Sequence, residues 1–558
     1  MLDHQQRGYR LLNIDEELSE MAVGSLEEVI EQMGAFGPFQ TLVLVILNLA
    51  ETPCAWAILF MAFAGATPEW TCQNATDITN GTIYDVTTQN MSYESTCDAQ
   101  GNLCPNPVFH EDFGTVVSQW RLVCDQHWLP SITTTVQMVG VMIGAVLAGI
   151  MGDNIGRKKT FFLFYFCLLV FCFITAFANS WLVFTILRFI VGTCVGGVLV
   201  ANYSLPMEFV GRKWRTLTGA IPFWAMGVMS LGLGAYLLRD WRHLSMATAV
   251  IGIPLLFTWW FVPESVRWLV IHERFEEAED VIRQVAKWNR KPVPDLSVIK
   301  VLAQKETQEM AGRNRYTYLD LFSNREFIKK SLVLGWIWFN CGMVFYGLSF
   351  GVRSLAGSRY LNMFISGSVE APAVLSVIYF NNCIGRRVTA LTYSLISGLA
   401  SLSVIVVVYT ASSADIEGAA ISGLAMAAKL GIAGAWISVQ VFTAESYPTC
   451  VRNLGYGFTC TLARIGSILA PSIIKLGTYS TWLPYLLFSI GMISSGLSIL
   501  TLPETNNNPL REYLHHPVKR EDSSDCCPES PLSSEKQSAN SHVDKILMAT
   551  SDNDVTRV

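Results

Sequence analysis

Apolar runs of about twenty residues recur along this chain, and the charged loop that separates two of them returns in a weaker copy. The loop is Gly149-Ile-Met-Gly-Asp-Asn-Ile-Gly-Arg-Lys-Lys159, and the copy is Asn381-Asn-Cys-Ile-Gly-Arg-Arg387. The acidic stretches Pro263-Glu-Ser265 and Pro503-Glu-Thr505 each close a set of apolar runs. Because about twenty apolar residues cross a bilayer as a helix, this repeated pattern predicts a duplicated transmembrane bundle, an architecture typical of transporters.

The composition argues against a soluble multidomain protein. Hydrophobic residues make up 51% of the 558-residue chain and charged residues 15%, and the mean hydropathy is +0.36. Residues 1–40 are polar and acidic, so no signal peptide is visible, and we expect the first span to act as an uncleaved anchor. Hydropathy predicts about twelve spans, near residues 41–66, 131–151, 161–179, 181–205, 217–238, 244–262, 331–352, 361–381, 389–411, 417–442, 457–476 and 482–502.

Basic residues are distributed unevenly among the loops. The loops after the second and fourth spans and the segment 271–330 are basic, whereas the segment 67–130 carries many acids and only Arg121 as a base. By the positive-inside rule, both termini face the cytosol of a plasma-membrane protein. We therefore expect a cytosolic N-terminus (1–40) and a first half (41–262) that contains an extracellular loop at 67–130. A cytosolic helical linker (263–330), a second half (331–502) and a disordered cytosolic tail (503–558) follow.

Two features of the 67–130 loop agree with an extracellular position. It holds three clustered N-glycosylation sequons, which begin at Asn74, Asn80 and Asn90. It also holds an even number of cysteines, as an oxidising compartment favours, at Cys72, Cys97, Cys104 and Cys124. Four cysteines allow three pairings, and the sequence does not select one.

Two shorter signals lie outside the spans. Apolar residues recur at helical spacing on one face of Phe275–Trp288, which predicts a surface helix in the linker. The chain ends on Thr556-Arg-Val558, with a hydroxyl residue two places before an apolar last residue. This ending fits capture by a PDZ domain through strand addition, although short tails match by chance about as often.

Three stretches carry a family resemblance: Glu208-Phe-Val-Gly-Arg-Lys213, Gly367-Ser-Val-Glu-Ala-Pro372 and Glu445-Ser-Tyr-Pro-Thr-Cys-Val-Arg-Asn-Leu-Gly455. With them the chain resembles the solute carrier 22 family of organic cation, anion and zwitterion transporters, in the major facilitator superfamily. Val344-Phe-Tyr-Gly-Leu-Ser349 is most similar to the carnitine and zwitterion branch. The resemblance implies an all-α membrane fold of twelve transmembrane helices in two pseudo-symmetric six-helix halves. Two positions depart from the family pattern, Val266 and Asn382.

Charged residues and glycines stand at matching places in the two halves and predict a cytosolic clasp that is closed in the outward-open state. They are Asp153, Gly156, Arg157, Glu208, Arg212, Glu264 and Arg267 in the first half and Gly385, Arg386, Glu445, Arg452 and Glu504 in the second. Exposed ion pairs contribute roughly 0–1 kcal/mol each, so only a network could bias the conformational equilibrium. The alternative is that these residues only anchor loops at the lipid headgroups.

Ionisable residues inside spans are costly and mark candidate transport sites. We expect Glu370 and Arg464 to bind substrate, and Arg188 and Lys429 to form structural pairs or snorkel. For Glu51 a substrate contact and a structural role are equally favoured. Side chains that could complete the pocket by cation–π attraction or hydrogen bonding are Trp224, Trp336, Phe339, Tyr346, Trp436 and Gln440.

A buried acid and a buried guanidinium suit a solute that carries both charges. The sequence therefore predicts transport of small organic ions, with carnitine- or betaine-like zwitterions first, organic anions second and organic cations third. The resemblance agrees, because Arg464 stands where the family's cation carriers tend to have an acid. A non-transporting receptor or scaffold that retains the fold is the alternative from a different class.

Enzyme functions find no support in the sequence. It has no Walker loop to hold a nucleotide and no His, Cys and Asp cluster with metal-ligand spacing. We expect no cofactor, no metal and no nucleic-acid partner, whereas sodium coupling stays open. The expected partners are a small organic ion and the lipid bilayer.

Overall fold

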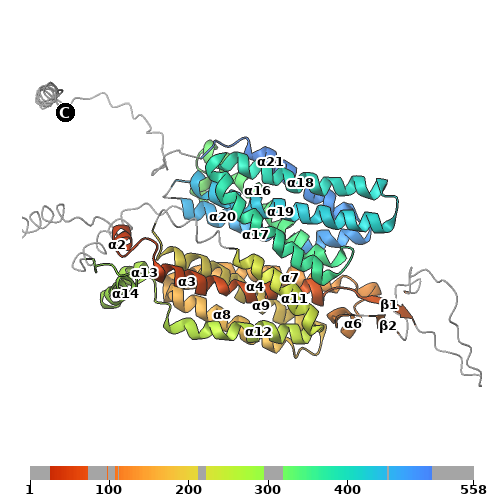
Figure 1. Ribbon diagram of the computed structural model, residues 1–558, viewed down its shortest axis with the longest axis horizontal. Coiled ribbons are helices and arrows are strands. Elements are labelled where there is room, and N and C mark those ends of the chain that lie inside the picture. Colours follow the sequence, from red (N-terminus) through yellow and green to blue (C-terminus); the bar gives the residue numbers. More distant parts are fainter. Residues whose placement is uncertain are drawn as a thin grey trace, which may run out of the picture. The chain divides into compact units, whose positions relative to one another are not determined.

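The computed structural model describes residues 26–72, 97, 107–110, 112–211, 222–294, 318–448 and 451–505. Figure 1 shows them as two groups of long helices, with a strand hairpin at one end and short helices at the other.

The first half contains six apolar spans. Its first span, Pro38–Ala64, is divided into α3 (Pro38–Leu49), α4 (Glu51–Leu59) and α5 (Met61–Ala64). The span begins at Pro38, whose fixed φ suits the first position of a helix. The other five spans are α7 (Leu129–Ile155), α8 (Arg157–Thr175), α9 (Trp181–Met207), α11 (Phe223–Leu238) and α12 (Trp241–Leu256).

The second half repeats this number of spans. They are α16 (Arg325–Gly351), α17 (Arg359–Cys383), α18 (Arg386–Thr410), α19 (Ala414–Ser446), α20 (Arg452–Lys475) and α21 (Leu483–Ile499). Among the described residues, 10 helices are long and apolar enough to cross a membrane, and α11 and α21 are shorter apolar helices. The expectation of about twelve spans is therefore confirmed, with ends displaced by a turn or two.

Glycines bring one pair of helices into backbone contact in each half. A Cβ atom on Gly144 of α7 would lie 1.9 Å from the Thr193 carbonyl oxygen of α9. In the second half, a Cβ on Gly466 of α20 would lie 2.0 Å from the Phe339 carbonyl oxygen of α16. No side chain fits in either contact, and small residues commonly permit such close helix packing in membranes.

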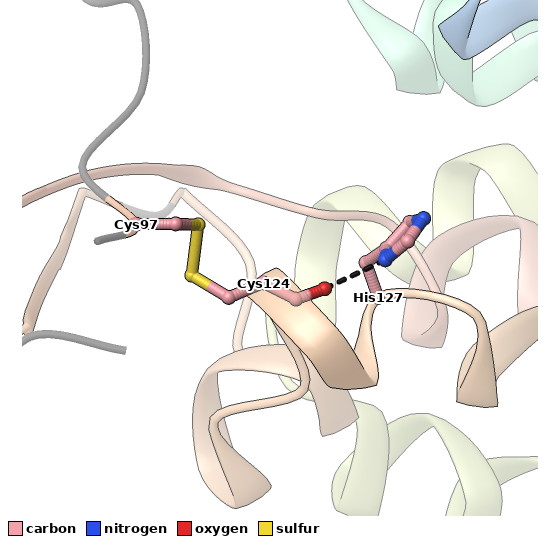
Figure 2. The surroundings of a disulfide bond; sticks show 3 residues. All are labelled: Cys97, Cys124 and His127. Carbon is pink, nitrogen blue, oxygen red and sulfur yellow. Dashed lines mark hydrogen bonds between the residues drawn. A yellow bond between two sulfur atoms is a disulfide. The ribbon is translucent and has the colours of Figure 1, made fainter. Parts of the chain in front are cut away.

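A hairpin and a disulfide lie in the long loop of the first half. The strands β1 (Glu69–Cys72) and β2 (Pro107–His110) pair antiparallel, with Glu69 opposite His110. Figure 2 shows the disulfide between Cys97 and Cys124, whose Cα atoms are 5.8 Å apart. A short helix, α6 (Val116–Trp120), lies between the hairpin and α7. We call this end of the bundle the hairpin end.

The opposite end carries the linker helices α13 (Val266–Ile271) and α14 (Phe275–Trp288), which Figure 1 shows near α2 (Leu26–Gln32). The predicted linker helix is thus confirmed as α14, and it buries its apolar face through Ala278, Val281, Ile282 and Val285. Asn289, just beyond α14, donates hydrogen bonds to the Met33 carbonyl oxygen and to Gln40 Oε1, both at 2.9 Å. The linker is therefore held against the start of the first span. We call this end the linker end.

Candidate functional site

The two halves meet directly at the hairpin end. Arg353, in the 3-10 turn Val352–Ser354 after α16, donates from Nη1 to the Gly65 carbonyl oxygen beyond α5, at 3.0 Å. The rings of Phe63 and Tyr360 stack across the same junction, with centroids 5.7 Å apart. The Tyr360 hydroxyl also donates to the Asp112 carbonyl oxygen at 3.5 Å. Contacts between the halves therefore close this end of the bundle.

Arg464 lies half-buried in the middle of α20. Its Nη1 donates to the hydroxyl of Tyr346 on α16 at 3.2 Å. The backbone contact of Gly466 with α16 holds the two helices close enough for this bond. Within the part of the chain that the structure describes, no acid forms an ion pair with Arg464. Among these residues the guanidinium therefore has no counter-charge.

Glu370, which was expected to bind substrate, pairs with a lysine of the protein. Its Oε1 lies 2.9 Å from Nζ of Lys429 on α19, and both side chains are buried. The ammonium group also donates to Ser349 Oγ at 2.5 Å and to the Phe345 carbonyl oxygen at 3.4 Å. The structural pairing expected for Lys429 thus has Glu370 as its partner. Glu370 and Arg464 therefore do not pair with each other: Glu370 pairs with Lys429, and Arg464 bonds the Tyr346 hydroxyl.

Aromatic rings connect the two charged groups. Phe345 and Tyr346 are neighbours on α16, with centroids 5.4 Å apart, and Phe345 lies 5.4 Å from Trp436 of α19. Trp338 continues the series, at 5.4 Å from Trp436. The sequence reasoning selected Tyr346 and Trp436 but missed Phe345 and Trp338, which share a face of α16 at a spacing of two helical turns.

Of the other selected side chains, Trp336 and Phe339 lie apart from this series, whereas Gln440 adjoins it through Tyr456, whose ring lies 5.6 Å from that of Trp338. Trp336 is 45% exposed and donates to Ser494 Oγ of α21 at 3.1 Å, and Phe339 stacks on it at 5.8 Å. The Trp224 indole lies on α11, and its buried Nε1 has no acceptor among the described residues. Gln440, on α19, lies beside the hydroxyl of Tyr456. Trp336 and Phe339 therefore face α21, away from the Phe345 face of α16.

Glu51 and Arg188 belong to the first half. Glu51, at the start of α4, accepts a hydrogen bond from Asn202 Nδ2 of α9 at 3.3 Å. Arg188 is fully buried on α9, where it donates to the Ala57 carbonyl oxygen at 3.3 Å. Its guanidinium lies 4.1 Å from the centre of the Phe60 ring. Arg188 is therefore buried and does not snorkel, and among the described residues it contacts a backbone carbonyl and aromatic rings. Glu51 is held by a contact within the first half.

A carboxylate lies at the start of α8, at the linker end. Glu264 Oε1 accepts the Lys158 amide at 2.9 Å. Gly156, immediately before the helix, has a φ of 108°, and a Cβ there would lie 2.3 Å from Glu264 Oε2. Only glycine suits both the backbone and the space at this position.

Arg157 connects the neighbouring helix ends of the first half. It pairs with Asp153 at 2.6 Å and with Glu208 at 3.3 Å. Burial raises the pKa of the Glu208 carboxyl, whereas a hydrogen bond from Ser265 and the charges of Arg157 and Arg267 lower it. These contacts all join helix ends within one half.

The second half holds the matching cluster at the start of α18. Glu504 accepts the backbone amides of Arg386 and Arg387 at 3.0 and 3.1 Å. Gly385 has a φ of 100°, and a Cβ there would lie 2.7 Å from Glu504 Oε2. Arg386 pairs with Glu445 at 3.1 Å, as Arg157 pairs with Glu208. These contacts also stay within one half, so the clasp between halves remains a prediction for the outward-open state.

Arg452 begins α20, and Cys72 ends β1. Among the residues that the structure describes, no group of three His, Cys, Asp or Glu side chains is placed to hold a metal ion. The selected residues that lie outside the described part of the chain are Asn74, Asn80, Asn90, Cys104, Arg212, Thr556 and Val558.

Comparison with known proteins identifies the family. Residues 82–515 match the model of the family described as "Sugar (and other) transporter". The chain is 32% identical to the organic cation transporter protein of Drosophila melanogaster over 520 residues, which cover 88% of this chain and 93% of the relative. It is 31% identical to solute carrier family 22 member 4 of Mus musculus, with 88% and 94% covered.

The chain belongs to the solute carrier 22 family of the major facilitator superfamily. Human organic cation/carnitine transporter 2 is 30% identical to it, with 88% of this chain and 93% of that protein covered. This solute carrier 22 member is therefore a multi-pass membrane transporter and not an enzyme.

Solved structures confirm the fold of this solute carrier 22 member. The proton:xylose symporter XylE bound to 6-bromo-6-deoxy-D-glucose matches with a TM-score of 0.58 at 16% identity, covering 85% of this chain and 98% of XylE. The partially occluded inward-open form of XylE from E. coli matches with a TM-score of 0.59 at 14% identity, with 85% and 100% covered. At these identities the likeness shows the major facilitator fold alone.

Proposed function

We propose that this solute carrier 22 member carries small organic solutes that bear a carboxylate, with betaine- or carnitine-like zwitterions first. The observation that supports this most directly is Arg464, a half-buried guanidinium that contacts the Tyr346 hydroxyl and pairs with no acid among the described residues. A cation removed from water without a counter-charge is costly, so the site favours a ligand that brings an anionic group. Alternating movement of the two halves would carry the ligand across.

The cationic end of such a zwitterion would lie against aromatic rings. Tyr346 touches Arg464 and is followed in space by Phe345 and Trp436. A quaternary ammonium over aromatic faces gains roughly 0.5–2 kcal/mol. Glu51, on the first half, supplies a carboxylate that could complete the site. In this proposal Glu370 contributes through its pair with Lys429 and does not contact the substrate directly.

The same charge distribution ranks the other substrates. Organic anions come second, because Arg464 can receive their carboxylate while the aromatic rings gain nothing from an ammonium group. Organic cations come third, because Arg464 repels them and Lys429 already neutralises Glu370.

We further propose that the hairpin end faces the outside of the plasma membrane and that both termini lie in the cytosol. The Cys97–Cys124 disulfide at the hairpin end supports this orientation, because disulfides persist in oxidising compartments. The basic residues of the loops at the linker end support it too. Glycosylation of the sequons, PDZ capture of the C-terminus and sodium coupling stay predictions.

Uptake of a matched panel tests the substrate class. The panel contains a labelled zwitterion such as carnitine or betaine, its methyl ester, and the same carboxylate without the ammonium group. We expect saturable uptake of the zwitterion, weaker uptake of the anion and the weakest uptake of the ester, measured with and without sodium. Saturable uptake of the ester alone would contradict the proposal. The absence of saturable flux for every member would favour a non-transporting receptor or scaffold.

A further inference from the structure

Lys429 lies among groups that together form a binding site for an ammonium ion. Its Nζ lies 2.9 Å from Glu370 Oε1 and 2.5 Å from Ser349 Oγ. The Phe345 carbonyl oxygen is 3.4 Å away, and the centre of the Phe345 ring is 3.5 Å away. A carboxylate, a hydroxyl, a carbonyl and an aromatic face are the groups that bind organic ammonium ions.

These groups come from different helices and converge on one point. Phe345 and Ser349 lie one turn apart on α16, Glu370 comes from α17, and the lysine comes from α19. Ser349 and the Phe345 carbonyl accept hydrogen bonds from the ammonium group, and Glu370 lies at ion-pair distance from it. Both charged side chains are buried, so the lysine cannot leave the acid without exposing an unpaired charge to a low dielectric.

The site is adjacent to the one proposed for substrate. Phe345, whose ring lies under the lysine, is the chain neighbour of Tyr346, which holds Arg464. Gly367, one turn before Glu370, packs against α11 of the other half, where a Cβ would lie 2.8 Å from the Ala225 carbonyl oxygen. Glu370 is therefore near the junction of the two halves, where an open carboxylate could receive a cationic solute.

We propose that Lys429 is a tethered cation that fills an organic-ammonium site made by Glu370, Ser349 and Phe345, and thereby excludes cationic solutes from it. This inference rests on the proposed function for the low rank of cations, and it makes Lys429 a specificity-determining residue. Removal of the lysine side chain frees the site for a small primary ammonium ion. The carboxylate of Glu370 is the group that such an ion needs.

Chemical rescue of a truncated lysine tests this directly. The full-length Lys429→Ala variant is purified, and its thermal unfolding is followed with n-butylammonium, which approximates the removed side chain, and with 1-butanol. At about 100 times its Kd, we expect n-butylammonium to raise the Tm of Lys429→Ala on the order of 2 °C. We expect no such shift for the wild-type protein, and none with 1-butanol.

Two further variants test separately whether n-butylammonium needs the space left by the lysine and the charge of Glu370. Lys429→Met refills most of the volume without a charge and leaves no room, so n-butylammonium should not stabilise it. The Glu370→Gln/Lys429→Ala double variant keeps the space and loses the acid, so it should not respond either. If Lys429→Ala is recovered folded only when n-butylammonium is present during preparation, the inference is supported in the same way.

Three results would overturn the inference. They are failure of n-butylammonium to stabilise or recover Lys429→Ala, an equal effect of 1-butanol, and an equal response of the double variant. None of these measurements uses uptake or a carboxylate ligand. The inference can therefore fail while the proposed carboxylate transport stands, and the reverse holds as well.

Discussion

Two cations of the second half, the buried Lys429 and the half-buried Arg464, have different neighbours. Lys429 has a carboxylate at 2.9 Å, so its charge is compensated inside the protein. Arg464 has the Tyr346 hydroxyl at 3.2 Å, which orients the guanidinium without neutralising it. A residue type alone does not show which cation is already neutralised inside the protein, whereas its partner on the next helix does.

The Tyr346 hydroxyl gives a prediction at this scale. Tyr346→Phe removes the acceptor that orients Arg464 and leaves the ring in place. A hydrogen bond to a charged group is worth roughly 1.5–3 kcal/mol, so we expect the KM for a zwitterion to rise about tenfold or more. Surface expression should be unchanged. Tyr393→Phe is the matched control, because its hydroxyl lies 2.5 Å from Ser376 Oγ on another pair of helices. Equal effects of the two changes would argue against an orienting role for Tyr346.

At the scale of elements, the two halves share one structural feature at the linker end. A carboxylate accepts amides at the start of a helix, with Glu264 at α8 and Glu504 at α18. An acid near a helix N-terminus typically stabilises the helix by about 0.3–1 kcal/mol at exposed sites. The positive-φ glycine before each helix lets the carboxylate approach. The repeated sequence motif therefore fixes the helix junction in each half.

Replacement of Gly385 tests whether this glycine is needed for the contact of Glu504 with the start of α18. Gly385→Ala puts a side chain on a φ of 100° and a Cβ 2.7 Å from Glu504 Oε2. Backbone strain of this kind costs about 1–3 kcal/mol, so we expect a lower Tm. Gly423→Ala is the matched control, because it lies in the interior of α19 with open space around it. That change should leave the Tm unchanged or raise it, since alanine is favoured by about 0.5–1 kcal/mol within a helix. A Tm for Gly385→Ala at or above that of Gly423→Ala would contradict this account.

At the scale of the whole molecule, contacts between the halves define the state that the structure shows. Arg353 bonds the Gly65 carbonyl, and Phe63 stacks on Tyr360, so the hairpin end is closed. Nearer the middle, Thr135 of α7 donates to the Ile468 carbonyl of α20 at 3.4 Å. Opening toward the hairpin end must break these contacts. Among the described residues, the ion pairs of Arg157 with Asp153 and Glu208 and of Arg386 with Glu445, in contrast, each lie within one half.

Much of the fold was predictable from the sequence, and less of the site was. Apolar runs predicted the spans, because a bilayer imposes a minimum helix length on every crossing. Helical spacing predicted α14, because that periodicity is local. The Glu370–Lys429 pair was not predictable, because it joins α17 to α19 and no local spacing connects them. Helical spacing places Trp336 and Tyr346 on different faces of α16, but no local pattern reveals that one face meets α21 and the other α20.

The proposal that Arg464 reads substrate charge is tested by the ratio of zwitterion uptake to organic cation uptake in Arg464→Asp and in the wild-type protein. The matched control is Lys475→Asp, the same charge reversal at the far end of α20. The account predicts that Arg464→Asp lowers this ratio by at least about tenfold, or about 1.4 kcal/mol, while Lys475→Asp leaves it unchanged. An unchanged ratio in an Arg464→Asp protein that reaches the membrane and still transports would contradict the account.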